Sequence, residues 1–243
     1  MAIFPHQLSF KISMPAGAVV FFSRLAWVAM GWFWVGHLAF AQQDNWAFSP
    51  EMLVRPKPAE RALLTDSIWY KLANMRLAKK RSHLATLRKG IRNADPEVAA
   101  RSKMIWARLQ PFDSCEVSLR LLRQTEQAAM RQNNDLLLAE SFFALGETHA
   151  RCGPNEQALL FFMKSLALRQ QVGLQYLADN HRLYYQLGGL YFRIGQYREA
   201  VWYMQLCQQQ PSYRMPPRSL INALHVAGLS YLQLGQTDSA AYW

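Results

Sequence analysis

Apolar and polar positions follow helical spacing through the second half of the chain, and the pattern returns about every 40 residues. Gly146, Gly188 and Gly228 mark the equivalent positions, 42 and 40 residues apart. Each is followed by an aromatic residue or histidine after 3 residues, a glycine after 7 and an alanine after 12. The positions expected to pack the repeats are Leu145, Gly146, Gly153, Ala158, Phe162, Leu187, Gly188, Tyr191, Gly195, Ala200, Gly228, Tyr231, Gly235 and Ala240.

The residue types at these positions predict two helices joined by a turn. The first glycine lets a second helix approach closely, and the second glycine marks where the first helix ends. The alanine belongs to the next helix and faces the first glycine. Phe162 and Met204, four residues further on, fill the space beside the next unit. We therefore predict an all-α fold, a solenoid of antiparallel helix pairs that bury their apolar faces against their neighbours.

The pattern is weaker on either side of the two complete units, which we place with the third in a region spanning 135–243. Residues 95–134 are expected to form a degenerate helix pair, because Asp95, Pro96 and Glu97 make a good helix start. Trp106 stands there in place of the first glycine. The third unit is cut at Trp243, early in its second helix, so we expect either a fragment of a longer protein or a truncated product.

The offsets resemble those of the tetratricopeptide repeat family. The period is longer than the family's usual length of roughly 34 residues. It is similar to the extended repeats found in extracytoplasmic regions of bacterial sensor histidine kinases. The resemblance implies a right-handed superhelix that acts as a scaffold for protein–protein interaction. It also implies that the first helix of each pair lines a concave face where ligand peptides bind.

Carried onto this chain, the resemblance assigns a groove for a peptide or protein partner. Its expected lining is Phe143, Glu147, Arg151, Arg182, Tyr185, Phe192, Arg193, Asn222 and His225. The four residues from α-helical positions 182 to 193 make a basic, aromatic patch suited to an acidic peptide, because arginine pairs with carboxylates and rings pack apolar side chains. The family's carboxylate clamp of lysine and asparagine is not reproduced. The alternative is a solvated groove with no partner.

The amino terminus has the pattern of an export signal. Residues 1–41 contain no acidic residue, and an apolar stretch follows Arg24 and ends in Ala39-x-Ala41. We expect cleavage after Ala41, with an uncleaved anchor as the alternative. Both place the remainder outside the cytoplasm, in the periplasm or at the periplasmic face of the inner membrane. Residues 42–58 are interpreted as a linker, since they combine prolines with little periodicity.

The net charge of +11 is concentrated near residues 55–103, which hold 13 Lys/Arg against 4 Asp/Glu, a net +9. Residues 59–94 are predicted to form a basic amphipathic helical segment whose centre runs from Lys71 to Arg92. The favoured interpretation is a solvated face on a helix packed against the first repeat. The alternatives are weak contact with an anionic membrane surface or with an acidic protein. Export argues against a nucleic-acid partner.

The chain carries no recognisable catalytic, nucleotide-binding or metal-binding motif, so we expect neither an enzyme within these residues nor a cofactor. His149 takes the position of Tyr191 and Tyr231 and is interpreted as a packing residue. Cys115, Cys152 and Cys207 are an odd number without metal-like spacing. We interpret them as small, semi-buried residues in preference to a disulfide.

The leading functional hypothesis is an exported interaction scaffold that forms the N-terminal sensory part of a longer bacterial signalling protein of the sensor histidine kinase type. The alternative is a self-standing periplasmic adaptor without a kinase. A repeat-bearing transcription regulator is a minor alternative, because it requires the leader to be misread. The identity of the partner, the signal and the oligomeric state stay open.

Overall fold

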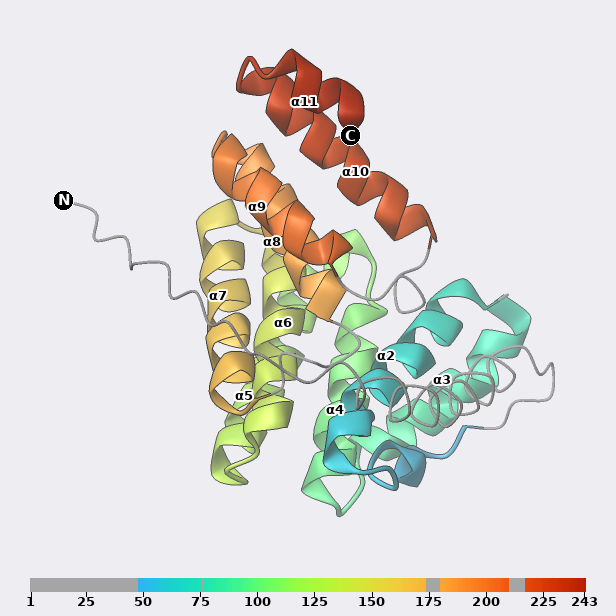
Figure 1. The fold of residues 1–243 in the computed structure, drawn as a ribbon. Coiled ribbons are helices and arrows are strands. Elements are labelled where there is room, and N and C mark those ends of the chain that lie inside the picture. Colours follow the sequence, from blue (N-terminus) through green and yellow to red (C-terminus); the bar gives the residue numbers. More distant parts are fainter. Residues whose placement is uncertain (1–47, 76, 174–179, 210–216) are drawn as a thin grey trace, which may run out of the picture. The chain divides into compact units, whose positions relative to one another are not determined.

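The computed structural model describes residues 48–75, 77–173, 180–209 and 217–243, all of which lie in the compact unit Ala47–Trp243 (Figure 1). The expected signal or anchor at residues 1–41 lies outside the described residues. Every regular element within these ranges is helical. In order they are η1 (Pro50–Leu53), α2 (Pro58–Asn74), α3 (Leu77–Ile91), α4 (Pro96–Arg108), η2 (Phe112–Ser114), α5 (Cys115–Arg131), α6 (Asp135–Cys152), α7 (Asn155–Gln171), α8 (Asn180–Arg193), α9 (Tyr197–Gln208), α10 (Pro217–Gln233) and α11 (Thr237–Tyr242).

The helices from α4 onward pack as consecutive pairs. The pairs are α4 with α5, α6 with α7, α8 with α9, and α10 with α11. The second helix of each pair also contacts the first helix of the next pair, and the first helices α4, α6, α8 and α10 contact one another in turn. This arrangement confirms the predicted all-α solenoid and makes the first helices a continuous row.

Local sequence explains where several helices begin and end. Asp95 caps α4, because its Oδ1 accepts hydrogen bonds from the backbone N–H groups of Glu97 (2.8 Å) and Val98 (3.1 Å). Gly195, at φ +79°, adopts the left-handed conformation that ends a helix. Gly153 does not, at φ −126°. Pro154 follows it, and a residue before proline is driven toward extended backbone.

The repeat glycines allow close packing of the two helices in a pair. A Cβ atom at Gly146 would lie only 2.5 Å from Cδ1 of Phe162, and one at Gly188 would lie 2.8 Å from Cε of Met204. The large residue 16 positions after the glycine therefore covers it. Phe162 also packs with Leu187 of the next pair in one buried apolar cluster.

A hydrogen bond that recurs between the helices of three pairs, α4–α5, α6–α7 and α8–α9, was not anticipated. Thr125, Ser165 and Cys207 occupy the same position, 19 residues after Trp106, Gly146 and Gly188. Each donates to a backbone carbonyl oxygen of the first helix, in Ala100 (3.3 Å), Ala139 (2.8 Å) and His181 (3.2 Å) respectively. The helix pair α4–α5 follows the same scheme although tryptophan replaces its glycine.

The cysteines correct one interpretation. Cys115 and Cys152 form a disulfide, with their Cα atoms 6.3 Å apart and a sequence separation of 37. Because α5 and α6 are neighbouring helices of opposite direction, the first residue of α5 lies beside the last residue of α6. The expectation of unpaired cysteines is therefore wrong for these two. Cys207 lies outside this bond and is a fully buried thiol.

The segments before α4 pack onto the first repeat. The described part of the expected linker contains η1, in which Leu53 is fully buried. The expected basic segment consists of two helices, α2 and α3, and α3 contacts both α4 and η1. Among the described residues, no helix combines the length and apolar character that a bilayer span requires.

Candidate functional site

The row of first helices carries the residues expected to line a groove. Helix α6 holds Phe143 and Glu147, each four residues from the next, with Arg151 one turn further on. Residues at this spacing share one face of a helix. Arg182 lies in the first turn of α8, the neighbouring helix of the row, and its guanidinium is 5.3 Å from the ring centroid of Phe143. The structure thus brings the α6 residues and Arg182 together.

Helix α2 crosses this face and contacts α4 and α6. Its Asp66 binds two arginines, through Oδ1 to Nη1 of Arg108 and through Oδ2 to Nη1 of Arg182 at 2.8 Å. Glu147 binds the same two arginines, at 3.0 Å to Nε of Arg108 and 2.7 Å to Nη2 of Arg182. Two carboxylates and two guanidiniums therefore alternate in a closed ring that joins α2, α4, α6 and α8.

Trp69, one turn after Asp66, lies against both arginines of the ring. Its centroid is 4.1 Å from Cζ of Arg108 and 5.1 Å from Cζ of Arg182, distances at which a cation is attracted to an indole face. The indole N–H donates to the backbone carbonyl of Arg108 at 3.3 Å. Carboxylate and aromatic ring thus act on the same two guanidiniums.

A second ionic cluster joins α2 to the row one to two turns earlier. Arg101 is fully buried and binds Glu97 at 2.8 Å and Glu140 at 2.8 Å. It also donates to Oγ1 of Thr65 at 3.1 Å. Arg61 of α2 binds the other oxygen of Glu97 at 2.6 Å. The contact of α2 with the row is therefore largely ionic at both places.

The charge of Asp66 is held by its surroundings. Burial alone would raise its pKa, but the positive charges of Arg182 and Arg108 and their hydrogen bonds act in the opposite direction and prevail. The pKa of Asp66 is therefore well below its usual value, and the side chain is a carboxylate throughout the neutral range.

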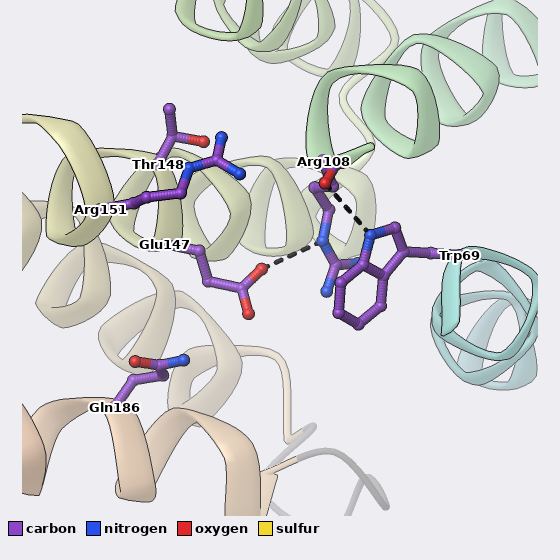
Figure 2. A pocket seen from close by; sticks show the side chains of 6 residues that line it. All are labelled: Trp69, Arg108, Glu147, Thr148, Arg151 and Gln186. Carbon is purple, nitrogen blue, oxygen red and sulfur yellow. Dashed lines mark hydrogen bonds and ion pairs between the residues drawn. The ribbon is translucent and has the colours of Figure 1, made fainter. Parts of the chain in front are cut away.

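A cavity of about 200 Å³ remains beside this contact (Figure 2). Its lining residues are Trp69, Arg108, Glu147, Thr148, Arg151 and Gln186. Arg151 donates from Nη1 to the backbone carbonyl of Gln110 at 3.3 Å and lies over the ring of Phe112, but its buried Nε has no hydrogen-bond partner. The cavity is below the range of about 300–1,000 Å³ typical of small-molecule sites.

The remaining residues of the expected groove lie further along the row. Tyr185 is half-buried beside the α9–α10 core, and Phe192 packs edge-on to Tyr197. Arg193 is exposed, eleven residues or about 16 Å along α8 from Arg182, so these arginines belong to different parts of the surface. On α10, Asn222 and His225 are both exposed.

Sequence reasoning missed the α2 side of the site. Asp66 and Trp69 belong to the segment 59–94, which was interpreted from its positive charge alone. Arg108 belongs to the expected degenerate helix pair 95–134, to which no binding residue was assigned. The only local signal was an acidic and an aromatic residue three positions apart on a helix. Within the described residues, no group of three or more His, Cys, Asp or Glu side chains is arranged to hold a metal ion.

Comparison with known families gives one match. Residues 181–210, which span α8 and α9 from His181, match the model of the tetratricopeptide repeat. The comparison with curated proteins found no match.

Proposed function

We propose that this chain, whose α8–α9 pair matches the tetratricopeptide repeat, is a protein–protein interaction scaffold that binds a segment of a partner along its row of first helices. The observation that carries the proposal is the continuity of that row from α4 to α10. Successive first helices present charged and aromatic side chains on one surface, which suits recognition of a peptide. The usual role of such repeats, binding without catalysis, supports a non-enzymatic scaffold.

The proposal includes action outside the cytoplasm. Two observations support it: the export-like leader that ends at Ala41, and the disulfide between Cys115 and Cys152. Disulfides persist in oxidising compartments such as the bacterial periplasm. Fractionation of a bacterial host that expresses the chain, followed by N-terminal sequencing, tests this part. A periplasmic product that begins at Gln42 is the expected result, and a cytoplasmic product with an intact leader contradicts it.

The finer proposal is that the scaffold is the sensory part of a sensor histidine kinase. Its support is the repeat period of 40–42 residues, which resembles the extended repeats of such receptors. A free periplasmic adaptor is the second candidate. Sequencing the gene past codon 243 separates them, because a membrane span with a kinase region favours the receptor, whereas a polar capping helix and a stop favour the adaptor.

Selection of peptides on the full chain tests the binding function. Displayed random peptides are enriched on the wild-type protein and then measured against Arg193→Glu, an exposed change on the first-helix row. The matched control is Arg198→Glu, the same change at an exposed position of the second helix α9. We expect acidic peptides whose affinity falls at least tenfold with the first variant and is unchanged with the second. Peptides with equal sensitivity to both, or no enrichment, would contradict the proposal.

A further inference from the structure

Helix α2 occupies the part of the row where a partner is expected, and its contacts describe what this part recognises. We propose that α2 is a resident ligand of the groove, and that the partner is a helical segment that displaces it by presenting the same groups. Those groups are a basic residue, a carboxylate five positions later and an aromatic ring three positions after that. The proposal rests on the scaffold function above and specifies its partner.

The charge balance of the repeats is the first support. Around the ring, the repeats supply two cations, Arg108 and Arg182, and one anion, Glu147. Asp66 of α2 supplies a second carboxylate and contacts both cations. Arg108 is nearly buried, so removing one of its two carboxylate partners is costly, and this surface of the repeats favours an acidic group from a segment outside them.

The second ionic cluster shows the converse balance. There, among the residues that the structure describes, the repeats place one cation, Arg101, between two anions, Glu97 and Glu140. Arg61 of α2 supplies the extra positive charge through its 2.6 Å contact with Glu97. The surface of the repeats therefore binds two charges of opposite sign, those of Arg61 and Asp66, at a fixed separation along one helix. A partner helix with the same two charges at the same spacing can bind there.

Another segment that carries the same groups could make the contacts that α2 makes with the repeats. At the two ionic clusters, α2 is joined to the first-helix row by ion pairs, a hydrogen bond and cation–π contacts. Ion pairs and cation–π contacts reform with any segment that carries the same groups. The apolar residues Ile68 and Leu72 of α2 are buried, however, so displacement exposes them and the resident helix is favoured when no partner is present.

The cavity beside Trp69 is where a partner can make a favourable contact that α2 does not make. With α2 in place, the cavity of about 200 Å³ remains and Nε of Arg151 has no hydrogen-bond partner. A partner with a second carboxylate that reaches Arg151 makes a contact that α2 does not make. Such an advantage is needed, because a tethered ligand competes at an effective concentration in the millimolar range.

The test uses the full chain and a fluorescent synthetic peptide of residues 57–75. Its binding is measured by anisotropy to the wild type and to the double variant Asp66→Arg, Trp69→Ala, whose own α2 no longer fits the ring. We expect the variant to bind the peptide at least tenfold more tightly than the wild type, and high salt to weaken this binding. A peptide with Asn and Ala at the positions of Asp66 and Trp69 is the matched control and should bind at least tenfold more weakly.

Absence of peptide binding by the double variant, with its helical content and unfolding transition retained, would overturn the proposal. Hydrogen exchange on the wild type decides the matter if the variant does not fold. Excess peptide should speed amide exchange in α2 while α6–α9 stay protected, and exchange of α2 at the global rate under all conditions would also overturn it. Peptides sensitive to Arg193→Glu would still support the scaffold function, so the two failures are distinguishable.

A glutamate scan of the same peptide tests the cavity. We expect one position where glutamate increases affinity at least threefold, and we expect Arg151→Gln in the protein to abolish that gain. A scan without any such position would contradict the assignment of Arg151 to a partner's carboxylate.

Discussion

The adjacent glycines of α8 allow the packing account to be measured on one helix. Gly188 and Gly189 share the same helix interior, so replacement of either by alanine gains helix propensity of about 1 kcal/mol. Their surroundings differ. A Cβ atom at Gly189 meets nothing within 4 Å, whereas one at Gly188 lies 2.8 Å from Cε of Met204 and 3.2 Å from the backbone oxygen of Ala200.

Gly189→Ala should therefore stabilise the protein by about 1 kcal/mol, which is a rise in melting temperature of about 2–4 °C for a domain of this size. Gly188→Ala makes the same propensity gain but crowds a buried site, and overpacking costs about 1–3 kcal/mol. We expect it to be less stable than Gly189→Ala by that amount. The methyl end of Met204 can move, so the lower part of the range applies unless the backbone contact with Ala200 resists.

Gly146→Ala extends the series. Its Cβ atom would lie 2.5 Å from the ring of Phe162, which is fully buried and cannot turn aside as a methionine end does. This variant should be the least stable of the three alanine variants. Gly188→Leu, which adds a larger side chain at the crowded site, should cost more than Gly188→Ala.

Urea unfolding followed by circular dichroism gives the free energy and the slope for each variant. Equal stabilisation by Gly188→Ala and Gly189→Ala would refute the reasoning, because it would show that close approach of α9 does not restrict residue 188. An altered slope would indicate a changed native or unfolded state, and a comparison of midpoints would then not be valid.

Three further predictions follow from the disulfide, the ionic ring and the buried thiol of Cys207. Breaking the Cys115–Cys152 bond, which closes a 37-residue separation, should cost about 3–4 kcal/mol on the chain-entropy model, and reductant should lower the urea midpoint of the wild type but not of Cys152→Ser. The pKa of Asp66 is lowered in the folded state, so the stabilisation that Asp66 gives to α2 is present above the ordinary aspartate pKa of about 3.9 and is lost as pH falls toward the lowered value. Protection of α2 from amide exchange should therefore be constant from about pH 5 to 8 and decline below about pH 4. The Asp66→Asn variant should lack this decline. Burial raises the pKa of Cys207 to about 12, so iodoacetamide should leave it unmodified in the native protein at about pH 8 and alkylate it fully in urea.

The helix pairs were predictable because their signals are local. Gly188, Tyr191 and Gly195 lie within two turns of one another, and their offsets record how one helix turns back onto the next. The same reasoning gave the start of α4 from Asp95. Gly153 followed a different rule, since the proline after it sets its backbone and no left-handed turn is needed there.

The disulfide was missed because cysteine spacing does not reveal which helix ends meet. Cys115 begins α5 and Cys152 ends α6, and only the antiparallel packing of those helices brings the two sulfurs together. Counting three cysteines favoured an unpaired set. Once helix pairs are placed, a cysteine at the start of one helix and another at the end of its antiparallel neighbour become an identifiable combination.

In the groove, the type of group that Arg182 binds was predictable from the sequence, but the segment that supplies this group was not. Arg182 was expected to bind the carboxylate of a partner peptide, and in the structure it binds Asp66 of the chain itself and also lies near the ring of Trp69. Asp66 and Trp69 lie 116 and 113 positions earlier in the sequence. They belong to a segment with a net positive charge, so the role of the single carboxylate of Asp66 was not apparent. Because α2 satisfies Arg182 internally, reversing the charge of Arg182 would place a third carboxylate beside Asp66 and Glu147 and disrupt the ring itself. Binding studies of this face must therefore separate loss of partner binding from loss of α2 packing. A substitution of the exposed Arg193 allows this separation, whereas a substitution of the buried Arg108 would disturb both.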